Sequence, residues 1–230
     1  MTHDAGYLPA LRFSFLNRVY DPVVALTSRE RRFRYSLLAG GVVEPGQRML
    51  DVGCGTGTLA CMLAGREAAA DVHGLDGDAD MIARCRAKAG ERGLRVNFLQ
   101  GRSSRLPYPD SHFDHVLSSL FFHHLGPDAK EEAFAEMLRV MKPGGRLHIA
   151  DWGVPHDALM RVAFLMVQLV DGFRTTSDNV RGRLPALMSW AGFSNVMVDC
   201  RFRTMLGTLE IVRSTKPPCH VLDARAAGSR

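Results

Sequence analysis

A glycine-rich segment, residues 49–57, carries the strongest chemical signal in the chain. Its sequence, Met-Leu-Asp-Val-Gly-Cys-Gly-Thr-Gly, predicts a buried strand that ends in an acid, then a tight turn and a helix. Three alternating glycines let the backbone bend sharply while a ligand lies directly against it. A turn at the carboxyl end of a strand is where open α/β sheets bind ligands. Asp51 adds an anionic acceptor, which suits a ligand with an ammonium or sulfonium charge.

Two nucleotide-type ligands are compatible with this segment. A dinucleotide fingerprint reads G-x-G-x-x-G/A and places a pyrophosphate on the helix N-terminus. The chain instead reads G-x-G-x-G, with Thr58 where the third glycine would fall. Asp76 follows the next predicted strand, where a carboxylate can accept both hydroxyls of a ribose. An acid there can also cap the next helix; we assign the ribose to Asp76 and the cap to Asp78.

The composition bounds the class of protein. The chain has 230 residues, 46% hydrophobic and 23% charged, which is ordinary for one globular α/β domain. Its net charge of +5 is mild and its basic residues are scattered, which favours a solvated surface. The five cysteines form no C-x-x-C pair and follow no secretory signal, so we expect free thiols in a cytoplasmic setting. The longest apolar run, residues 158–173, is too short and too interrupted by polar residues to insert stably in a bilayer.

Strands and helices of similar length alternate along the chain, which predicts a parallel, doubly wound sheet. Residues 7–40 read as helical with a break at Pro22. Further helices are predicted at 80–92 and 128–141, and strands at 71–75, 95–99, 112–118 and 146–150. The sequence Lys-Pro-Gly-Gly at 142–145 predicts a turn before the last of these strands.

Four separated segments agree with one family. They are residues 50–57, Asp76, residues 106–110 with 113–114, and residues 138–145. Together they resemble the class I S-adenosylmethionine-dependent methyltransferases of the ubiquinone/menaquinone-biosynthesis and general small-molecule kind. Val19-Tyr20-Asp21 also resembles the Tyr-Asp that precedes the glycine motif in the quinone enzymes. The resemblance covers residues 15–150 well and the rest in outline.

The resemblance implies a fold and a domain organisation. The fold is an α/β, Rossmann-like, seven-stranded, mostly parallel sheet with helices on both faces and an antiparallel C-terminal edge hairpin. We expect one methyltransferase domain over residues 1–213 and a tail over 214–230. Within the domain we expect an N-terminal helical cover (1–44), a cofactor-binding core (45–150), a helical substrate-side insertion (151–190) and the edge hairpin (191–213).

The same resemblance implies how S-adenosylmethionine binds and S-adenosylhomocysteine leaves. Asp51 and the glycines would line the methionine part, Asp76 would hold the ribose, and Met81 would pack on the adenine. The predicted cofactor-binding residues are Asp51, Gly53, Cys54, Gly55, Asp76, Gly77, Met81, Arg102, Ser103 and Ser118. Arg102 departs from the family, which commonly has an acid there for the adenine amine, and a guanidinium cannot accept a hydrogen bond. Ser103 or the backbone around it must then receive the amine.

Residues 118–124, after the predicted fourth strand, should face the transferred methyl group. They lack the Asp/Asn-Pro-Pro-aromatic run of base-methylating enzymes and the metal-binding acid of catechol-type enzymes, so we expect no nucleic-acid substrate and no metal. His123 and His124 are the acid/base candidates, with capping or packing as the alternative. The predicted substrate contacts are Tyr20, Phe121, Phe122 and Arg174.

Residues 158–170 predict a helix that is apolar around most of its circumference and must therefore be buried. Core packing, a cover over the substrate, and a homodimer or membrane-surface face are the three alternatives. After it, we expect a capped helix start at Ser177 or Asp178. The sequence thus predicts methyl transfer to a small, partly apolar acceptor by in-line displacement. Quinone or lipid methylation at a membrane surface, an NAD(P)-dependent oxidoreductase and a nucleic-acid methyltransferase are the alternatives.

Overall fold

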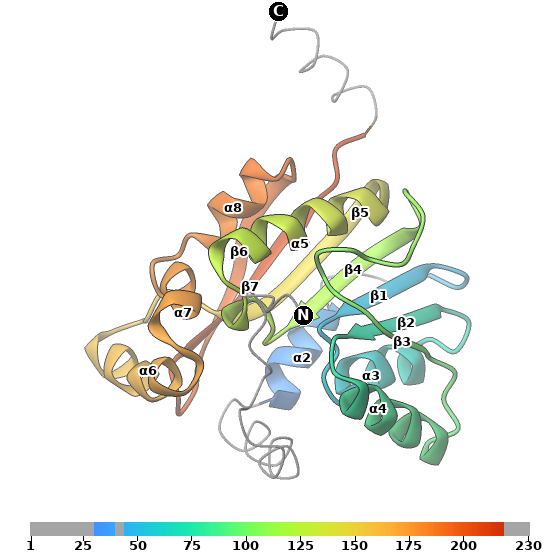
Figure 1. Ribbon diagram of the computed structural model, residues 1–230, viewed down its shortest axis with the longest axis horizontal. Helices are drawn as coiled ribbons and strands as arrows, with labels where there is room; N and C mark the ends of the chain where they lie inside the picture. Colours follow the sequence, from blue (N-terminus) through green and yellow to red (C-terminus); the bar gives the residue numbers. More distant parts are fainter. Residues whose placement is uncertain (1–29, 40–43, 219–230) are drawn as a thin grey trace, which may run out of the picture.

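A computed structural model describes residues 30–39 and 44–218, whose strands form one seven-stranded sheet in the order β3-β2-β1-β4-β5-β7-β6 (Figure 1). The strands are β1 (Arg48–Val52), β2 (Asp71–Asp76), β3 (Asn97–Gln100), β4 (Phe113–Ser119), β5 (Met141–Trp152), β6 (Ser194–Arg203) and β7 (Thr208–Thr215). The helices are α2 (Glu30–Ala39), α3 (Thr58–Arg66), α4 (Ala79–Glu91), α5 (Pro127–Val140), α6 (Ala158–Asp171), α7 (Phe173–Val180) and α8 (Leu184–Trp190), with a short 3-10 helix, η1 (Phe122–His124).

The first five strands pair in parallel, whereas β7 runs antiparallel to both β5 and β6. The predicted Rossmann-like sheet with an antiparallel C-terminal hairpin is therefore confirmed. The strand order reverses between β1 and β4, from which successive strands are added outwards in opposite directions. Ligands of open α/β sheets bind outside the carboxyl ends of the strands at such a switch point. The glycine-rich turn follows β1 at this position.

Helices cover both faces of the sheet (Figure 1). On one face, α2, α3, α4 and α6 bury apolar side chains that include Phe33, Leu59 and Phe164. On the other face, α5 and α8 bury Phe134 and Met188, among others. A central parallel strand is covered from both sides, which is why β1 and β4 are buried at nearly every position instead of alternating between buried and exposed residues.

The C-terminal part of the sheet is longer than the sequence predicts. Residues 142–145, predicted as a turn, belong to β5. The Gly144 amide donates to the Lys216 carbonyl at 3.0 Å, and the Lys216 amide donates to the Gly145 carbonyl at 2.9 Å. The predicted hairpin end at residue 213 is therefore too early, because β7 continues to Thr215 and Lys216 still pairs with β5.

Helix starts were predicted with mixed success. Asp78 caps α4 as expected, since its carboxylate accepts a hydrogen bond from the Asp80 amide at 2.8 Å. The expected helix start at Ser177 or Asp178 is wrong, because α7 begins at Phe173 and both residues lie inside it. Gly172, with φ of 95°, allows the sharp break between α6 and α7 that polar capping residues were expected to make.

Helix α6 is buried along only one stripe, formed by Met160, Phe164, Val167 and Gln168. Within the described residues the other elements of the fold bury this helix on one side only, because α6 lies at an outer corner of the fold (Figure 1), so its burial in a partner or at a membrane surface stays a prediction. No helix within residues 30–39 and 44–218 has both the length and the apolar character of a membrane span. Tyr20 and most of the predicted cover over 1–44 lie outside the described residues.

Candidate active site

The turn after β1 places three bent glycines at the carboxyl end of the sheet. Gly53, Gly55 and Gly57 have φ of 71°, 53° and 75°, in the left-handed region that favours glycine. The Gly53 amide donates to the Leu75 carbonyl at 2.8 Å, which ties the turn to β2. A Cβ on Gly53 would lie 2.3 Å from the Phe121 ring, so only glycine fits there. A Cβ on Gly55 would instead enter open space, so the front of the turn is free to receive a ligand.

Asp51 buries a carboxylate beside this turn. Only 1% of the residue is exposed, and neither carboxylate oxygen has a hydrogen-bond partner within the described chain. Burial raises the pKa of Asp51 to about 7, although the positive charge of Arg34 and the nearby Ala60 amide, which makes no hydrogen bond of good geometry, oppose the shift. A buried carboxylate without donors is unfavourable, and a cationic ligand group would relieve it. The unpartnered oxygens therefore fit the ammonium group of a bound S-adenosylmethionine.

Asp76, at the end of β2, holds the glycine turn from the other side. Its Oδ2 accepts a hydrogen bond from the Gly55 amide at 2.8 Å, and its Oδ1 accepts one from the Asp78 amide at 3.0 Å. Burial raises the pKa of Asp76, and these two amides oppose the shift. Each carboxylate oxygen has a second lone pair. The same side chain can therefore order the turn and still accept hydroxyl groups from a ligand.

A cleft of about 210 Å³ opens in front of β1, β2 and β3. Five predicted cofactor residues line it, namely Gly53, Asp76, Gly77, Arg102 and Ser103. Phe121, predicted as a substrate contact, lines it as well.

Residues that the sequence did not single out complete the wall: Leu75, Gly101, Ser104, Leu125, Ala129 and Glu132. An apolar wall with polar groups at its edge suits a nucleoside. Glu132 supplies a carboxylate near the position where Arg102 replaces the usual acid.

Five predicted cofactor residues do not line this cleft: Asp51 and Gly55, described above, and Ser118, Cys54 and Met81. The hydroxyl of Ser118 is fully buried and donates to the Val52 carbonyl at 2.8 Å, so it joins β4 to β1. Cys54 is buried beneath the turn with its Sγ 3.9 Å from Sγ of Cys85, and both thiols are free. Met81 is 7% exposed and lies on the buried face of α4. These side chains support the turn and the sheet.

Two predicted substrate contacts lie elsewhere in the structure. Phe122 is fully buried and stacks on Phe134 with ring centroids 4.5 Å apart. η1 turns this ring into the core beneath α5 and away from the cleft, which does not support a substrate contact, and that role stays a prediction. Arg174 is exposed in the first turn of α7 and does not line the cleft.

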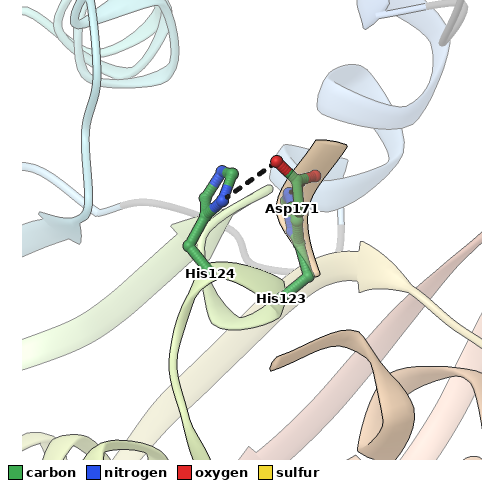
Figure 2. Close-up of side chains that lie close together, drawn as sticks. All are labelled: His123, His124 and Asp171. Atoms are coloured by element: carbon green, nitrogen blue, oxygen red, sulfur yellow. Dashed lines mark ion pairs between the residues drawn. The ribbon is translucent and has the colours of Figure 1, made fainter. Parts of the chain in front are cut away.

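The segment after β4 brings two histidines against Asp171, from a distant part of the chain (Figure 2), and one of them against Asp151. His123 Nδ1 lies 2.7 Å from Asp151 Oδ1, at the end of β5. His123 Nε2 lies 3.6 Å from Asp171 Oδ2, at the end of α6, and His124 Nδ1 lies 3.6 Å from Asp171 Oδ1. His123 is buried, whereas the His124 and Asp171 side chains each keep 14% of their surface exposed. The cluster therefore reaches solvent on the side of α6.

The two histidines have opposite pKa shifts. Burial lowers the pKa of His123, but the charge and hydrogen bond of Asp151, with the charge of Asp171, outweigh burial and raise it. Burial and the neighbouring His123 charge lower the pKa of His124 well below its usual value. Asp151 is itself fixed, because its Oδ1 accepts a hydrogen bond from the Trp152 amide at 2.7 Å. A proton held on His123 Nδ1 by Asp151 leaves Nε2 as the nitrogen that can accept another.

The same group contains ligand types that bind divalent cations. One ligand atom each from His123, His124 and Asp171 lie within 4.8 Å of one another. With metal bonds of about 2.1 Å, two ligand atoms can be at most about 4.2 Å apart, so the side chains would have to move closer. The arrangement is that of an ion-pair cluster, and the sequence-based expectation of no metal stays a prediction.

Lys130 holds the helix that packs on η1. Its fully buried Nζ donates to the Thr175 carbonyl at 2.7 Å, to Asn179 Oδ1 at 3.2 Å and to Asp178 Oδ2 at 3.3 Å. Burial lowers the pKa of Lys130, and the charge of Asp178 opposes the shift. These bonds fix α7 to α5 and so support the position of the two histidines.

The sequence analysis missed Asp151, Asp171 and Lys130. Asp151 had a detectable signal, because it follows a predicted strand in the way that Asp51 and Asp76 were recognised. Asp171 and Lys130 lie on helices and meet their partners only through the tertiary fold, so no local pattern identifies them.

Comparison with known proteins agrees with this geometry. Residues 49–145 match the protein family described as Methyltransferase domain. A demethylmenaquinone methyltransferase from Thermus thermophilus is 34% identical over 203 residues, which cover 80% of this chain and 89% of that protein. A ubiquinone/menaquinone biosynthesis C-methyltransferase from Pseudomonas fluorescens is 31% identical over 189 residues, 71% of each chain. The structure of a SAM-dependent methyltransferase from Methanosarcina mazei shares the fold, with a TM-score of 0.64 at 22% identity over 76% of this chain and 95% of that one.

The sheet topology, the glycine turn at its switch point and the acid at the end of β2 define the class I methyltransferase fold and cofactor site. The chain belongs to the S-adenosylmethionine-dependent methyltransferases. Among the members compared, it is similar to enzymes named for demethylmenaquinone and for ubiquinone/menaquinone biosynthesis. The oxidoreductase alternative is thereby set aside.

Proposed function

We propose that the chain transfers a methyl group to a ring carbon of a quinol-type aromatic acceptor. The observation that carries this proposal is the 34% identity to a demethylmenaquinone methyltransferase across 89% of that protein's length. The second relative is named a C-methyltransferase, which favours carbon as the accepting atom. A small, partly apolar acceptor of this kind is also what the sequence predicts, in place of a nucleic acid. The reaction is assigned to the cytoplasm, where free thiols such as Cys54 and Cys85 persist.

The cofactor is assigned to the cleft in front of the glycine turn. Asp51 receives the ammonium group, the exposed face of Gly55 receives the amino-acid tail, and Asp76 receives the ribose hydroxyls. Ser103 and Glu132 are the groups near the cleft that can accept from the adenine amine, which Arg102 cannot do. When bound, S-adenosylmethionine supplies an electrophilic methyl group whose bond to sulfur breaks as the bond to the acceptor carbon forms.

His123 is assigned as the general base. An acceptor hydroxyl gives its proton to Nε2, which makes the neighbouring ring carbon nucleophilic. After methylation that carbon gives its own proton to solvent as aromaticity returns, and the oxygen takes back the proton held on Nε2. Asp151 holds Nδ1–H at 2.7 Å and so keeps the ring in the required tautomer. Asp171 lies 3.6 Å from Nε2, where its charge favours the imidazolium that forms. His124 remains neutral and packs against this pair.

Turnover of a short-chain prenylated naphthoquinol in detergent, with labelled S-adenosylmethionine, tests the proposal. His123→Gln should lower kcat at least about 100-fold without changing the Kd of S-adenosylhomocysteine. His112→Gln, at the opposite end of β4, is the matched control and should keep its turnover. Asp151 raises the pKa of His123, and the base acts deprotonated, so Asp151→Asn should move the acidic limb of the kcat–pH profile to lower pH.

Two results would contradict the proposal separately. If S-adenosylhomocysteine binds but no label reaches the quinol carbon, the acceptor class is wrong. If His123→Gln turns over the quinol at the normal rate, the base is another group.

A further inference from the structure

Helix α6 and the start of α7 expose a row of large apolar side chains. Its members are Leu159, Val162, Leu165, Met166, Leu169, Val170 and Phe173, with exposed fractions between 37% and 68%. We call these seven residues the α6 face. Single exposed apolar residues are normal, but a contiguous set of this size marks a surface that contacts another apolar phase.

The α6 face is continuous and projects outwards. At about 100° per residue, its six members on α6 fall within an arc of about 140°, opposite the buried stripe of Met160, Phe164 and Val167. The β6–β7 turn borders the buried side of α6, because Gly207 packs on Phe164, and nearby Met205 is 69% exposed. α6 occupies an outer corner of the molecule (Figure 1). The apolar surface is therefore a protruding ridge that can meet a flat partner.

The charges around this ridge favour an anionic partner. Between residues 157 and 174, the carboxylates are Asp157 and Asp171. Asp157 forms an ion pair of 2.6 Å with Arg203, and Asp171 faces the histidine cluster. Arg161 and the exposed Arg174 carry the remaining charge on this segment. Amphipathic helices with an apolar face and flanking arginines bind at the interface of bilayers that contain anionic lipid.

We propose that the α6 face is a docking surface for an anionic lipid bilayer. The inference rests on the proposed function, because a prenylated quinol resides in such a bilayer and would enter beside α6. The C-terminal end of α6 carries Asp171, 3.6 Å from His123, so one helix links the docking surface to the proposed base.

Vesicle co-sedimentation tests the docking surface without turnover. The wild-type protein should bind vesicles of phosphatidylcholine with phosphatidylglycerol, and bind phosphatidylcholine alone more weakly. Met166→Glu combined with Leu169→Glu should lower the partition coefficient at least about 100-fold, because both side chains are exposed and are replaced by charges of the lipid's own sign. Trp190→Glu, which changes an 80% exposed residue on α8, is the matched control and should stay within about twofold. Arg174→Glu should reduce the preference for phosphatidylglycerol.

Three outcomes would overturn the inference: no binding by the wild type, binding that the double variant retains, or a dimer in solution that the double variant dissociates. The last would assign the α6 face to a second copy. A protein that methylates the quinol in detergent but does not bind vesicles keeps the proposed function and loses this inference. A protein that binds vesicles through the α6 face but leaves the quinol unmethylated keeps the docking surface and loses the acceptor.

Discussion

Replacing Asp51 with asparagine should make the ligand-free protein more stable at alkaline pH while weakening its hold on the cofactor. The carboxylate is buried without a donor, and its pKa rises from the ordinary 3.8 to about 7. Because the folded state holds the proton more tightly than the unfolded chain, the stability that this proton contributes is full below pH 3.8 and is lost as the pH rises through 7.

The size of the effect follows from these two pKa values. Each unit of difference between the folded and unfolded pKa is worth about 1.36 kcal/mol. Relative to acidic pH, the wild-type protein therefore loses about 1.7 kcal/mol of unfolding free energy by pH 5 and about 4.3 kcal/mol by pH 8. Asparagine does not titrate, and the other groups contribute equally to both proteins. The difference in unfolding free energy between Asp51→Asn and the wild type should therefore grow by about 2–3 kcal/mol from pH 5 to pH 8.

Urea unfolding of both proteins at several pH values measures this difference. Asp128→Asn, which alters an exposed carboxylate in the first turn of α5, is the control and should give a difference that varies by less than about 0.5 kcal/mol. Calorimetric titration with S-adenosylhomocysteine should show binding to the wild type that strengthens from pH 6 to pH 8, and binding to Asp51→Asn that is at least about tenfold weaker. A stability difference that stays flat with pH would show that Asp51 is not the group with the raised pKa, and the argument for its partner would fail.

Two further variants test other parts of the site. Gly53→Ala should lower cofactor affinity at least about tenfold, because its Cβ would clash with Phe121. Gly90→Ala, at a helical position with open space around it, is the control and should keep its affinity. Equal affinities of the two variants in a titration with the cofactor would refute the steric argument. Lys130→Met should destabilise the fold by about 3–5 kcal/mol in thermal or urea unfolding, because the buried Asp178 would keep only its 3.7 Å ion pair with Arg183 and the Thr175 carbonyl would lose its donor. Restored stability in Lys130→Met/Asp178→Leu would identify the poorly paired charge as the cause, whereas an unaffected single variant would contradict it.

The fold was largely predictable because its signals are local. Apolar runs followed by glycine or acid, as at Leu50 to Gly53, identify a buried strand and a ligand-binding turn from the sequence alone. The capping role of Asp78 was readable for the same reason, since a cap involves residues two or three positions apart. The Lys-Pro-Gly-Gly segment was wrongly predicted as a turn, because its pairing with Lys216, more than seventy residues away in the sequence, overrides the local turn preference.

The candidate base was only half predictable. His123 and His124 stood out because few side chains after the fourth strand can take a proton. Only the tertiary structure distinguishes the two histidines. Asp151 and Asp171 raise the pKa of His123, whereas burial lowers the pKa of His124. Two neighbouring phenylalanines also have different environments. Phe121 lines the cleft and Phe122 lies in the core, because η1 turns successive side chains to different sides. Periodicity rules do not resolve a single turn of 3-10 helix.

The place of β7 has a consequence for how the molecule is made. Among the strands that the structure describes, the last to leave the ribosome, β7, is not at the margin of the sheet but between β5 and β6. Until residues 208–215 have emerged, β5 has an unpaired edge and β6 has no neighbour to join. Nascent chains therefore carry an open, aggregation-prone strand until residues 208–215 can pair, and a truncation before Leu209 should leave that edge permanently bare.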